Sequence, residues 1–211
     1  MKAVHVAAWL SIVVSFSSYA QQISWTEFMG GKIATYSSGG NPKAKGIEVS
    51  FDYPLSWGGA EGKRPNTLYQ VASKNGKGLE LCNLVIKDIP LLVGYTVTPQ
   101  DVAELFKPTS LRDFIPSDAE FITGTMTTID GQPEAWIHFV QEIDRVGIQL
   151  KMMWIMYSVY IDKKLIIFSC SVGDSASKPV EELQKRYKAY FPLFQQMANS
   201  FVIHSKWKRR P

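Results

Sequence analysis

The chain has 211 residues and a formal net charge of +4, with 45% hydrophobic and 20% charged residues. The positive excess comes from the two ends, because Lys2 lies near the start and Lys206, Lys208, Arg209 and Arg210 lie within the last six residues. Setting these aside leaves 18 of the 23 basic residues against 19 acidic ones. The body of the chain is therefore nearly neutral, which excludes a nucleic-acid-binding surface, and its length suits one domain.

The first twenty residues have the pattern of a secretory signal. After Met1 and Lys2 comes the apolar stretch AVHVAAWLSIVVSFSS, and Ser18-Tyr19-Ala20 then puts small residues at the two positions that a signal peptidase reads. An uncleaved membrane anchor is the alternative, but a span needs about 20 apolar residues. The sequence predicts a signal peptide over 1–20, cleavage after Ala20, and a periplasmic or secreted protein beginning at Gln21.

The expected organisation after the signal is a lead-in, one domain and a tail. Residues 30–46 are rich in Gly, Ser and Lys, which is typical of a mobile segment. We therefore expect a flexible N-terminal segment over 21–46, a single domain over 47–205, and a basic tail over 206–211.

The first half of the domain has the pattern of a β-meander. Strand-like runs occupy 47–53, 67–73 and 79–87, and the Asn75-Gly76 pair between the last two suits a tight hairpin. The stretch VSFDYPLSWGG poses a separate question, since Trp57 either covers core surface or offers its ring to a ligand. Pro54 cannot donate a ladder hydrogen bond. We therefore favour a structural corner over a ligand site.

Thr98 marks the start of a helix in the middle of the chain. It can cap the helix, Pro99 suits the first turn, and Asp101 can complete a capping box. Four longer strands are expected after this helix, and the short turns between them force antiparallel neighbours. These strands lie at 119–128, 133–143, 148–161 and 164–172.

An amphipathic helix is expected to close the domain from near Pro179, with Pro192 kinking or splitting it and a short extended piece at 201–203. The runs KMMWIMYSVYI and KLIIFSCSV are apolar on both alternating faces, so both faces of the sheet must be covered. The predicted fold class is α+β: one antiparallel sheet of about six to seven strands between helices.

Cys82 and Cys170 both lie in strand-like runs, LELCNLVI and LIIFSCSV. Export makes a disulfide plausible, and the bond would add roughly 4 kcal/mol in the chain-entropy model. The alternative is two small buried hydrophobic residues. No Cys-x-x-Cys pair indicates a redox or zinc site.

Four short motifs resemble the PsbP-like fold family, whose namesake is the extrinsic subunit P of photosystem II and which includes exported bacterial domains and a Ran-binding nuclear import factor. The motifs are F-D-Y-P-x-x-W at 51–57, the Gly131-Gln132-Pro133 turn before AWIHFV, the strand LIIFSCSV, and the closing MANSF. The resemblance implies a sheet sandwiched between helices, a Tyr-Pro corner whose tryptophan packs on the sheet edge, and partner binding without catalysis.

The sequence offers no catalytic constellation. It has no nucleophile elbow, zinc-protease, P-loop or dinucleotide motif. His138 shares a strand face with Glu142, but at about 3.3 Å per residue the two lie roughly 13 Å apart, too far to share a metal. We interpret His138 as a strand histidine, with a ligand from a neighbouring strand as the alternative, and we expect no catalytic residue, metal or cofactor.

Two surfaces are candidates for binding. Met and Trp side chains on one strand could floor an apolar pocket, although such clusters are more often core; these residues are Met152, Trp154 and Met156. Trp57 at the Tyr-Pro corner is a separate candidate binding residue. The tail residues Lys206, Trp207, Lys208, Arg209 and Arg210 could contact an anionic membrane or protein surface. The sequence favours an exported, non-enzymatic accessory protein with a protein partner; the alternative is a carrier of a small apolar ligand.

Overall fold

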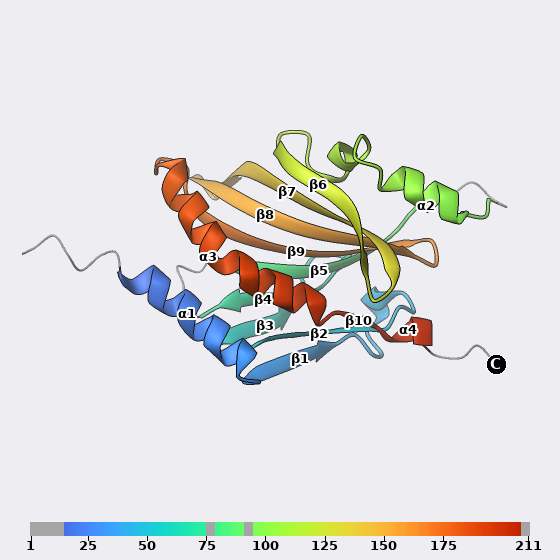
Figure 1. The fold of residues 1–211 in the computed structure, drawn as a ribbon, viewed down its shortest axis with the longest axis horizontal. Coiled ribbons are helices and arrows are strands. Elements are labelled where there is room, and N and C mark those ends of the chain that lie inside the picture. Colours follow the sequence, from blue (N-terminus) through green and yellow to red (C-terminus); the bar gives the residue numbers. More distant parts are fainter. Residues whose placement is uncertain (1–14, 75–78, 91–94, 208–211) are drawn as a thin grey trace, which may run out of the picture.

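The computed structural model describes residues 15–74, 79–90 and 95–207. Two antiparallel sheets and helices on both faces of the larger sheet make up the fold (Figure 1). The elements are, in chain order, α1 (Ser15–Met29), β1 (Ile33–Ser37), η1 (Pro42–Ala44), β2 (Val49–Pro54), β3 (Trp57–Glu61), β4 (Thr67–Ser73), β5 (Leu81–Asp88), α2 (Pro99–Leu105), η2 (Leu111–Phe114), β6 (Glu120–Ile129), β7 (Gln132–Arg145), β8 (Ile148–Ile161), β9 (Lys164–Ser175), α3 (Val180–Asn199), β10 (Val202–Ile203) and α4 (His204–Trp207).

The larger sheet has seven strands in the order β3-β4-β5-β9-β8-β7-β6, all antiparallel. The four long strands β6 to β9 follow one another through tight turns, as the sequence predicts. Asp130-Gly131, Val146-Gly147 and Asp162-Lys163 all adopt positive φ angles in these turns, which is the backbone that matches the twist of a hairpin. The predicted α+β class is therefore confirmed.

A second sheet, in the order β1-β2-β10, was not expected from the sequence. The run at 47–53 forms β2, but it pairs with β1 and β10 rather than with β4. β3 takes the place beside β4, because Trp57 begins a strand in which Gly59 lies under the Tyr69 ring. A Cβ on Gly59 would stand only 2.1 Å from the Tyr69 hydroxyl. The two glycines at 58 and 59 thus permit close packing in a strand, not a chain reversal.

The segment expected to be flexible, 21–46, contains most of α1 and all of β1. β1 pairs with β2 along its whole length, from Ile33 opposite Pro54 to Ser37 opposite Ser50. This long-range pairing fixes a run that local composition alone describes as a loop. No helix within the described residues is long and apolar enough to cross a membrane.

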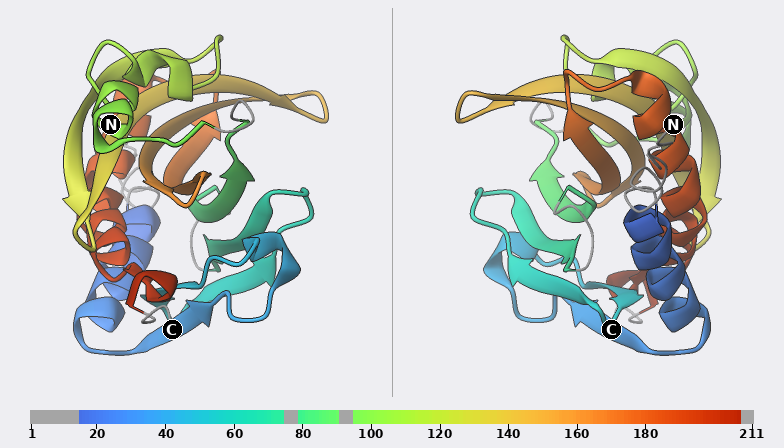
Figure 2. Two further views of the ribbon diagram at one scale, coloured as in Figure 1. Left: turned by 90° about the vertical axis from the view of Figure 1, so that its right-hand side faces the viewer. Right: turned by 90° about the vertical axis from the view of Figure 1, so that its left-hand side faces the viewer.

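Helices cover both faces of the seven-stranded sheet. α3 lies across one face, with α1 beside it, whereas α2 and η2 lie over the other (Figures 1 and 2). The first core contains Tyr190, Leu193 and Phe194 of α3; the second contains Val102 and Phe106 at α2. α2 begins with the predicted capping box, in which Thr98 and Asp101 exchange hydrogen bonds.

α3 runs as one helix from Val180 to Asn199 with Pro192 inside it, so of the two expected outcomes, a kink or a split, the split does not occur. Proline removes one helix hydrogen bond, but burial of the neighbouring side chains Tyr190, Leu193 and Phe194 holds the turn in place. The short extended piece after the helix is β10, as predicted.

Arg186 fixes the first half of α3 to the end of the sheet. Its guanidinium donates at 2.9 Å to both Asp174 and the carbonyl of Gly173, and it also pairs with Glu80. Arg186 and Glu80 are buried. The network therefore ties α3 to β9 and to the residue directly before β5.

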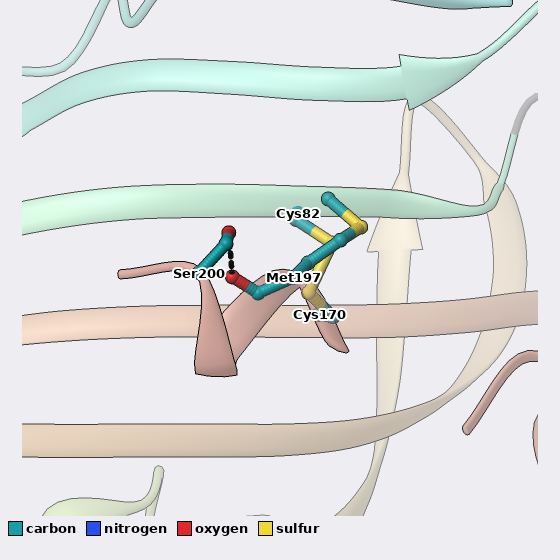
Figure 3. Close-up of a disulfide and its surroundings, with 4 residues drawn as sticks. All are labelled: Cys82, Cys170, Met197 and Ser200. Carbon is teal, nitrogen blue, oxygen red and sulfur yellow. Dashed lines mark hydrogen bonds between the residues drawn. A yellow bond between two sulfur atoms is a disulfide. The ribbon is translucent and has the colours of Figure 1, made fainter. Parts of the chain in front are cut away.

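A disulfide joins Cys82 and Cys170, which stand directly opposite each other on β5 and β9. Figure 3 shows the bond between these two strands, with Met197 and Ser200 from the end of α3 beside it. The sequence left open either a disulfide or two separate buried thiols, and the structure contains the disulfide. Both cysteines are fully buried.

Candidate functional site

A cleft of about 340 Å³ separates α3 from the last strands of the sheet. The sheet side consists of Ile122 from β6, His138 from β7 and Met153 from β8. The helix contributes residues spaced three and four apart, which places them in one stripe on its surface. These residues are Gln184, Tyr187, Lys188 and Phe191.

Strand alternation explains which sheet residues reach the cleft. Met153 is paired with Val140 and shares a face with His138, two residues away on β7. Ile122 lies at an irregularity in the β6–β7 register between Phe121 and Thr123, where one extra residue turns its side chain toward α3.

His138 stands at the centre of the sheet wall. Its Nδ1 lies 3.3 Å from the hydroxyl of Tyr187, and the rings of Trp136, Tyr187 and Phe191 meet it edge-on at 5.0 to 5.7 Å. Burial lowers the pKa of His138 to about 4, so the ring is neutral near pH 7. Its Nε2 is buried and has no hydrogen-bond partner among the described residues.

The lining of the cleft is mainly apolar and aromatic. Its members are four apolar or aromatic side chains, one amide, one cation and one neutral imidazole. A histidine whose pKa is about 4 is a weak base near neutral pH, and the lining provides no carboxylate or thiol to work with it. Within the described residues, no group of three or more metal-binding side chains gathers.

Glu134 is a second buried titratable group on the same face of β7. It is 2% exposed, and its Oε1 has no partner in the described part of the chain. Burial raises the pKa of the Glu134 carboxyl to about 8. Burial also raises the pKa of the Tyr157 hydroxyl, with a smaller contribution from the charge of Glu134. The carboxyl is therefore largely protonated at neutral pH.

We expect stability to fall by about 2 kcal/mol between pH 6.5 and pH 8 because of Glu134. A carboxyl whose pKa is raised in the fold stabilises below its unfolded pKa, near 4.5, and this contribution is lost as pH rises through 8. His138 acts oppositely, because its lowered pKa makes its contribution complete above 6.5 and lost as pH falls toward 4. The two effects offset each other between pH 4.5 and 6.5.

Urea unfolding of the wild type and of Glu134→Gln across this range checks the expectation. The variant should keep its stability up to pH 8. Glu142→Gln, an exposed change on the same strand face, should behave like the wild type. An equal loss in Glu134→Gln and the wild type would show that another group is responsible.

The predicted binding residues on β8 lie on the other side of the sheet. Met152 and Met156 are buried, and Trp154 stacks on Phe139 at 5.9 Å beneath the α2 region. They alternate with Met153, and only Met153 reaches the cleft. The Met-rich strand thus contributes one residue to the cleft rather than forming its floor.

Trp57 is part of the first core and 2% exposed. Its Nε1 donates to Ser24 of α1 at 3.0 Å, and its ring meets Tyr190 and Phe194 edge-on at 6.4 Å. β2 ends at Pro54, as predicted. Trp57 therefore occupies a structural corner and offers no ring face to a ligand.

Two of the predicted tail residues belong to α4 and contact the β6–β7 turn. Lys206 donates to the carbonyl of Asp130 at 2.6 Å, and the indole of Trp207 donates to the Asp130 carboxylate at 3.1 Å. Trp207 as a whole nevertheless remains 63% exposed. The other three residues, Lys208, Arg209 and Arg210, lie outside the described residues.

A larger hollow of about 540 Å³ follows α1 and the turn after it. Of its lining, only Ile23 carries an apolar side chain; the rest is Gln22, Thr26, Glu27, Gly30 and Lys32. One segment supplies all of these residues. The cleft at α3, where a helix and three strands converge, is the better candidate site.

Sequence reasoning placed His138 on a strand but did not bring it together with the closing helix, and it did not single out Ile122, Lys188 or Phe191. The spacing of residues 184, 187, 188 and 191 is a signal that could have found the helix wall. The sheet wall depends on β6 lying at the edge, which local patterns do not reveal.

No protein-family model matches the sequence, and a comparison with curated proteins finds no match. Among solved structures, the Saccharomyces cerevisiae Ran-binding protein Mog1p is 10% identical, over 81% of this chain and 95% of its own, with a TM-score of 0.50. Cyanobacterial PsbP from Synechocystis sp. PCC 6803 is 21% identical, over 82% and 92%, with a TM-score of 0.47.

A third structure, LpqN of Mycobacterium tuberculosis, which is involved in cell envelope biogenesis, is 9% identical over 81% of this chain and 91% of its own, with a TM-score of 0.43. At such identities, the likeness to Mog1p shows the fold alone. That fold is the PsbP-like fold expected from the sequence.

Proposed function

We propose that this protein is an exported, non-enzymatic accessory protein, and that a partner protein docks at the cleft between α3 and the sheet edge. The observation that carries the proposal is the lining of the cleft. It is mainly apolar and aromatic, and its one histidine is neutral near pH 7. Mog1p, which has the same fold, is a Ran-binding protein, so the fold is compatible with partner binding.

Export rests on the signal pattern before Gln21. Cleavage after Ala20 would divide α1, which spans Ser15–Met29, and would keep Ser24, the residue that accepts the Trp57 hydrogen bond. A further contact with an anionic surface would depend on residues 208–210, since Lys206 and Trp207 already bind Asp130.

A carrier of a small apolar ligand is the second candidate. The volume of about 340 Å³ lies at the lower end of the range of small-molecule sites, roughly 300 to 1,000 Å³. A carrier would hold a ligand tightly enough to retain it through purification. A docking protein would retain a polypeptide instead.

Affinity capture from the host's envelope extract should separate these functions. We expect the immobilised wild type to retain a defined polypeptide, and Phe191→Lys to lose it because a cation replaces an aromatic wall of the cleft. Leu55→Lys, an exposed change at the corner between β2 and β3, is the matched control and should retain it. Melting midpoints of the three proteins establish that each is folded.

A native mass spectrum of protein purified from its own host completes the test. A measured mass that corresponds to a chain starting at Gln21 would support export. A small molecule that the wild type retains and Phe191→Lys loses would favour the carrier. If Phe191→Lys and Leu55→Lys capture the same polypeptides and no small molecule is retained, the cleft is not the docking site.

A further inference from the structure

β6 is an edge strand with few of the features that protect an edge. It is ten residues long, and from Phe121 to Ile129 it contains no charged residue and no proline. Within the described residues it pairs only with β7. The opposite edge strand, β3, is five residues long and ends in a charge at Glu61. Edges without charge, proline or cover are ready to accept another strand.

The side chains of β6 that share a face with α3 are small or apolar. Thr123, Thr125 and Thr127 stand opposite His138, Trp136 and Glu134, which places them on the α3 side of the sheet. All three threonines are exposed, and Ile122 is 47% exposed at the mouth of the cleft. Figure 2 shows β6 and α3 side by side along one side of the molecule.

The edge and the cleft together fit an extended polypeptide. The main chain of such a segment would satisfy the outward N–H and C=O groups of β6, which a small apolar ligand would leave unpaired. Because alternate side chains of a strand project to one face, one of them would enter the cleft beside Met153 and Phe191.

Charge narrows the choice of polypeptide. Lys188 lies exposed at the rim of the cleft and pairs with no carboxylate among the described residues. With Phe121–Ile129 itself uncharged, Lys188 is the charge that an incoming segment would meet at the cleft. An acidic residue near the inserted side chain would complement it.

We propose that β6 and α3 form a groove for an extended segment of a partner protein, which adds as a further strand to the sheet, inserts an apolar side chain into the cleft and places a carboxylate near Lys188. This inference rests on the proposed function and names the mode and chemistry of docking. A second copy of this chain, paired edge to edge through β6, is the competing occupant.

Selection from a phage-displayed library of short random peptides provides the probe. We expect peptides enriched on the wild type to have an alternating pattern, with an apolar residue close to Asp or Glu. Their affinities would be measured by fluorescence polarisation. Failure to enrich any peptide above a β6 proline variant would overturn the proposal.

Proline substitution at two adjacent positions supplies an internal control. In an antiparallel pair, the backbone N–H and C=O groups of one residue point toward the partner strand, and those of the next residue point away from it. Of Thr125→Pro and Met126→Pro, one therefore removes an outward N–H and should fold normally while binding the peptides at least about tenfold more weakly. The other breaks a bond to β7 and should lower the melting midpoint. Unchanged peptide affinity in the folded variant would refute strand addition.

Charge reversal tests the carboxylate. Lys188→Glu should weaken binding of an acidic peptide about fivefold. A peptide in which lysine replaces the acidic residue should bind the Lys188→Glu variant about as well as the acidic peptide binds the wild type. An equal loss for both peptides would reject the assigned charge contact. If light scattering shows that the wild type is a dimer and that the normally folded proline variant is a monomer, the occupant of the β6 edge is a second copy of this chain.

The two proposals fail separately. If Phe191→Lys abolishes partner capture but the folded proline variant does not, docking at the cleft stands and strand addition is wrong. If neither variant affects capture, both are wrong.

Discussion

Removal of the bond between Cys82 and Cys170 should lower the free energy of unfolding by about 4 to 5 kcal/mol. The two residues are 88 positions apart, so the bond closes a long loop in the unfolded chain and reduces its conformational freedom. The bond also joins β5 to β9. Among the described residues, these two strands are the one neighbouring pair in the seven-stranded sheet that is not consecutive in the chain. Within this sheet, the cross-link thus secures the strand pairing that closes the longest loop.

Urea unfolding of the wild type, with and without reductant, and of the double variant Cys82→Ala, Cys170→Ala measures the loss. The reduced wild type is the matched control, because it keeps both sulfur atoms in the core while opening the bond. We expect the double variant to be destabilised at least as much as the reduced wild type, because it also removes two buried sulfur atoms. Equal stability of the oxidised and reduced wild type would show that the bond does not stabilise the fold.

Tight turns made the meander predictable from the sequence. Each of the three turns between β6 and β9 needs two residues at positive φ, and Asp130-Gly131 is a pair that tolerates this backbone. Short connections then leave antiparallel pairing as the only geometry. The capping box at Thr98 is likewise a local signal, and it too was found where the sequence placed it.

The second sheet could not be predicted because its pairings are long-range. The paired residues of β1 and β2 lie 13 to 21 positions apart, from Ser37–Ser50 to Ile33–Pro54, and β10 reaches the same strand from the far end of the chain. Gly58 and Gly59 also concealed β3, since glycine is rare in strands and common in turns. Their reason for being there, the Tyr69 ring above Gly59, appears only in three dimensions.

The candidate site escaped prediction for a related reason. The alternation on β8 shows that Met153 and Met152 face opposite ways, but not which face has an opening. That depends on β6 being an edge strand and on where Arg186 anchors α3. A methionine-rich run therefore signals burial in general, and the cleft takes only Met153 from it.

Trp57→Ala should cost about 3 to 5 kcal/mol of stability, because it removes a large aromatic side chain from a packed core. Trp57 touches three parts of the fold: Tyr190 and Phe194 on α3, Ser24 on α1, and its own strand β3. Its loss would leave a cavity where these elements meet. The surrounding side chains belong to different elements and cannot easily move together to fill it.

Two milder variants divide the loss into its parts. Ser24→Ala removes only the hydrogen bond from the indole and should cost about 1 kcal/mol, whereas Trp57→Phe also reduces the buried area. Denaturant midpoints of the three variants should therefore rank Ser24→Ala as the most stable and Trp57→Ala as the least. If Trp57→Ala melts like the wild type and yet no longer captures the partner, the Tyr-Pro corner is a binding site, and Trp57 serves binding rather than stability.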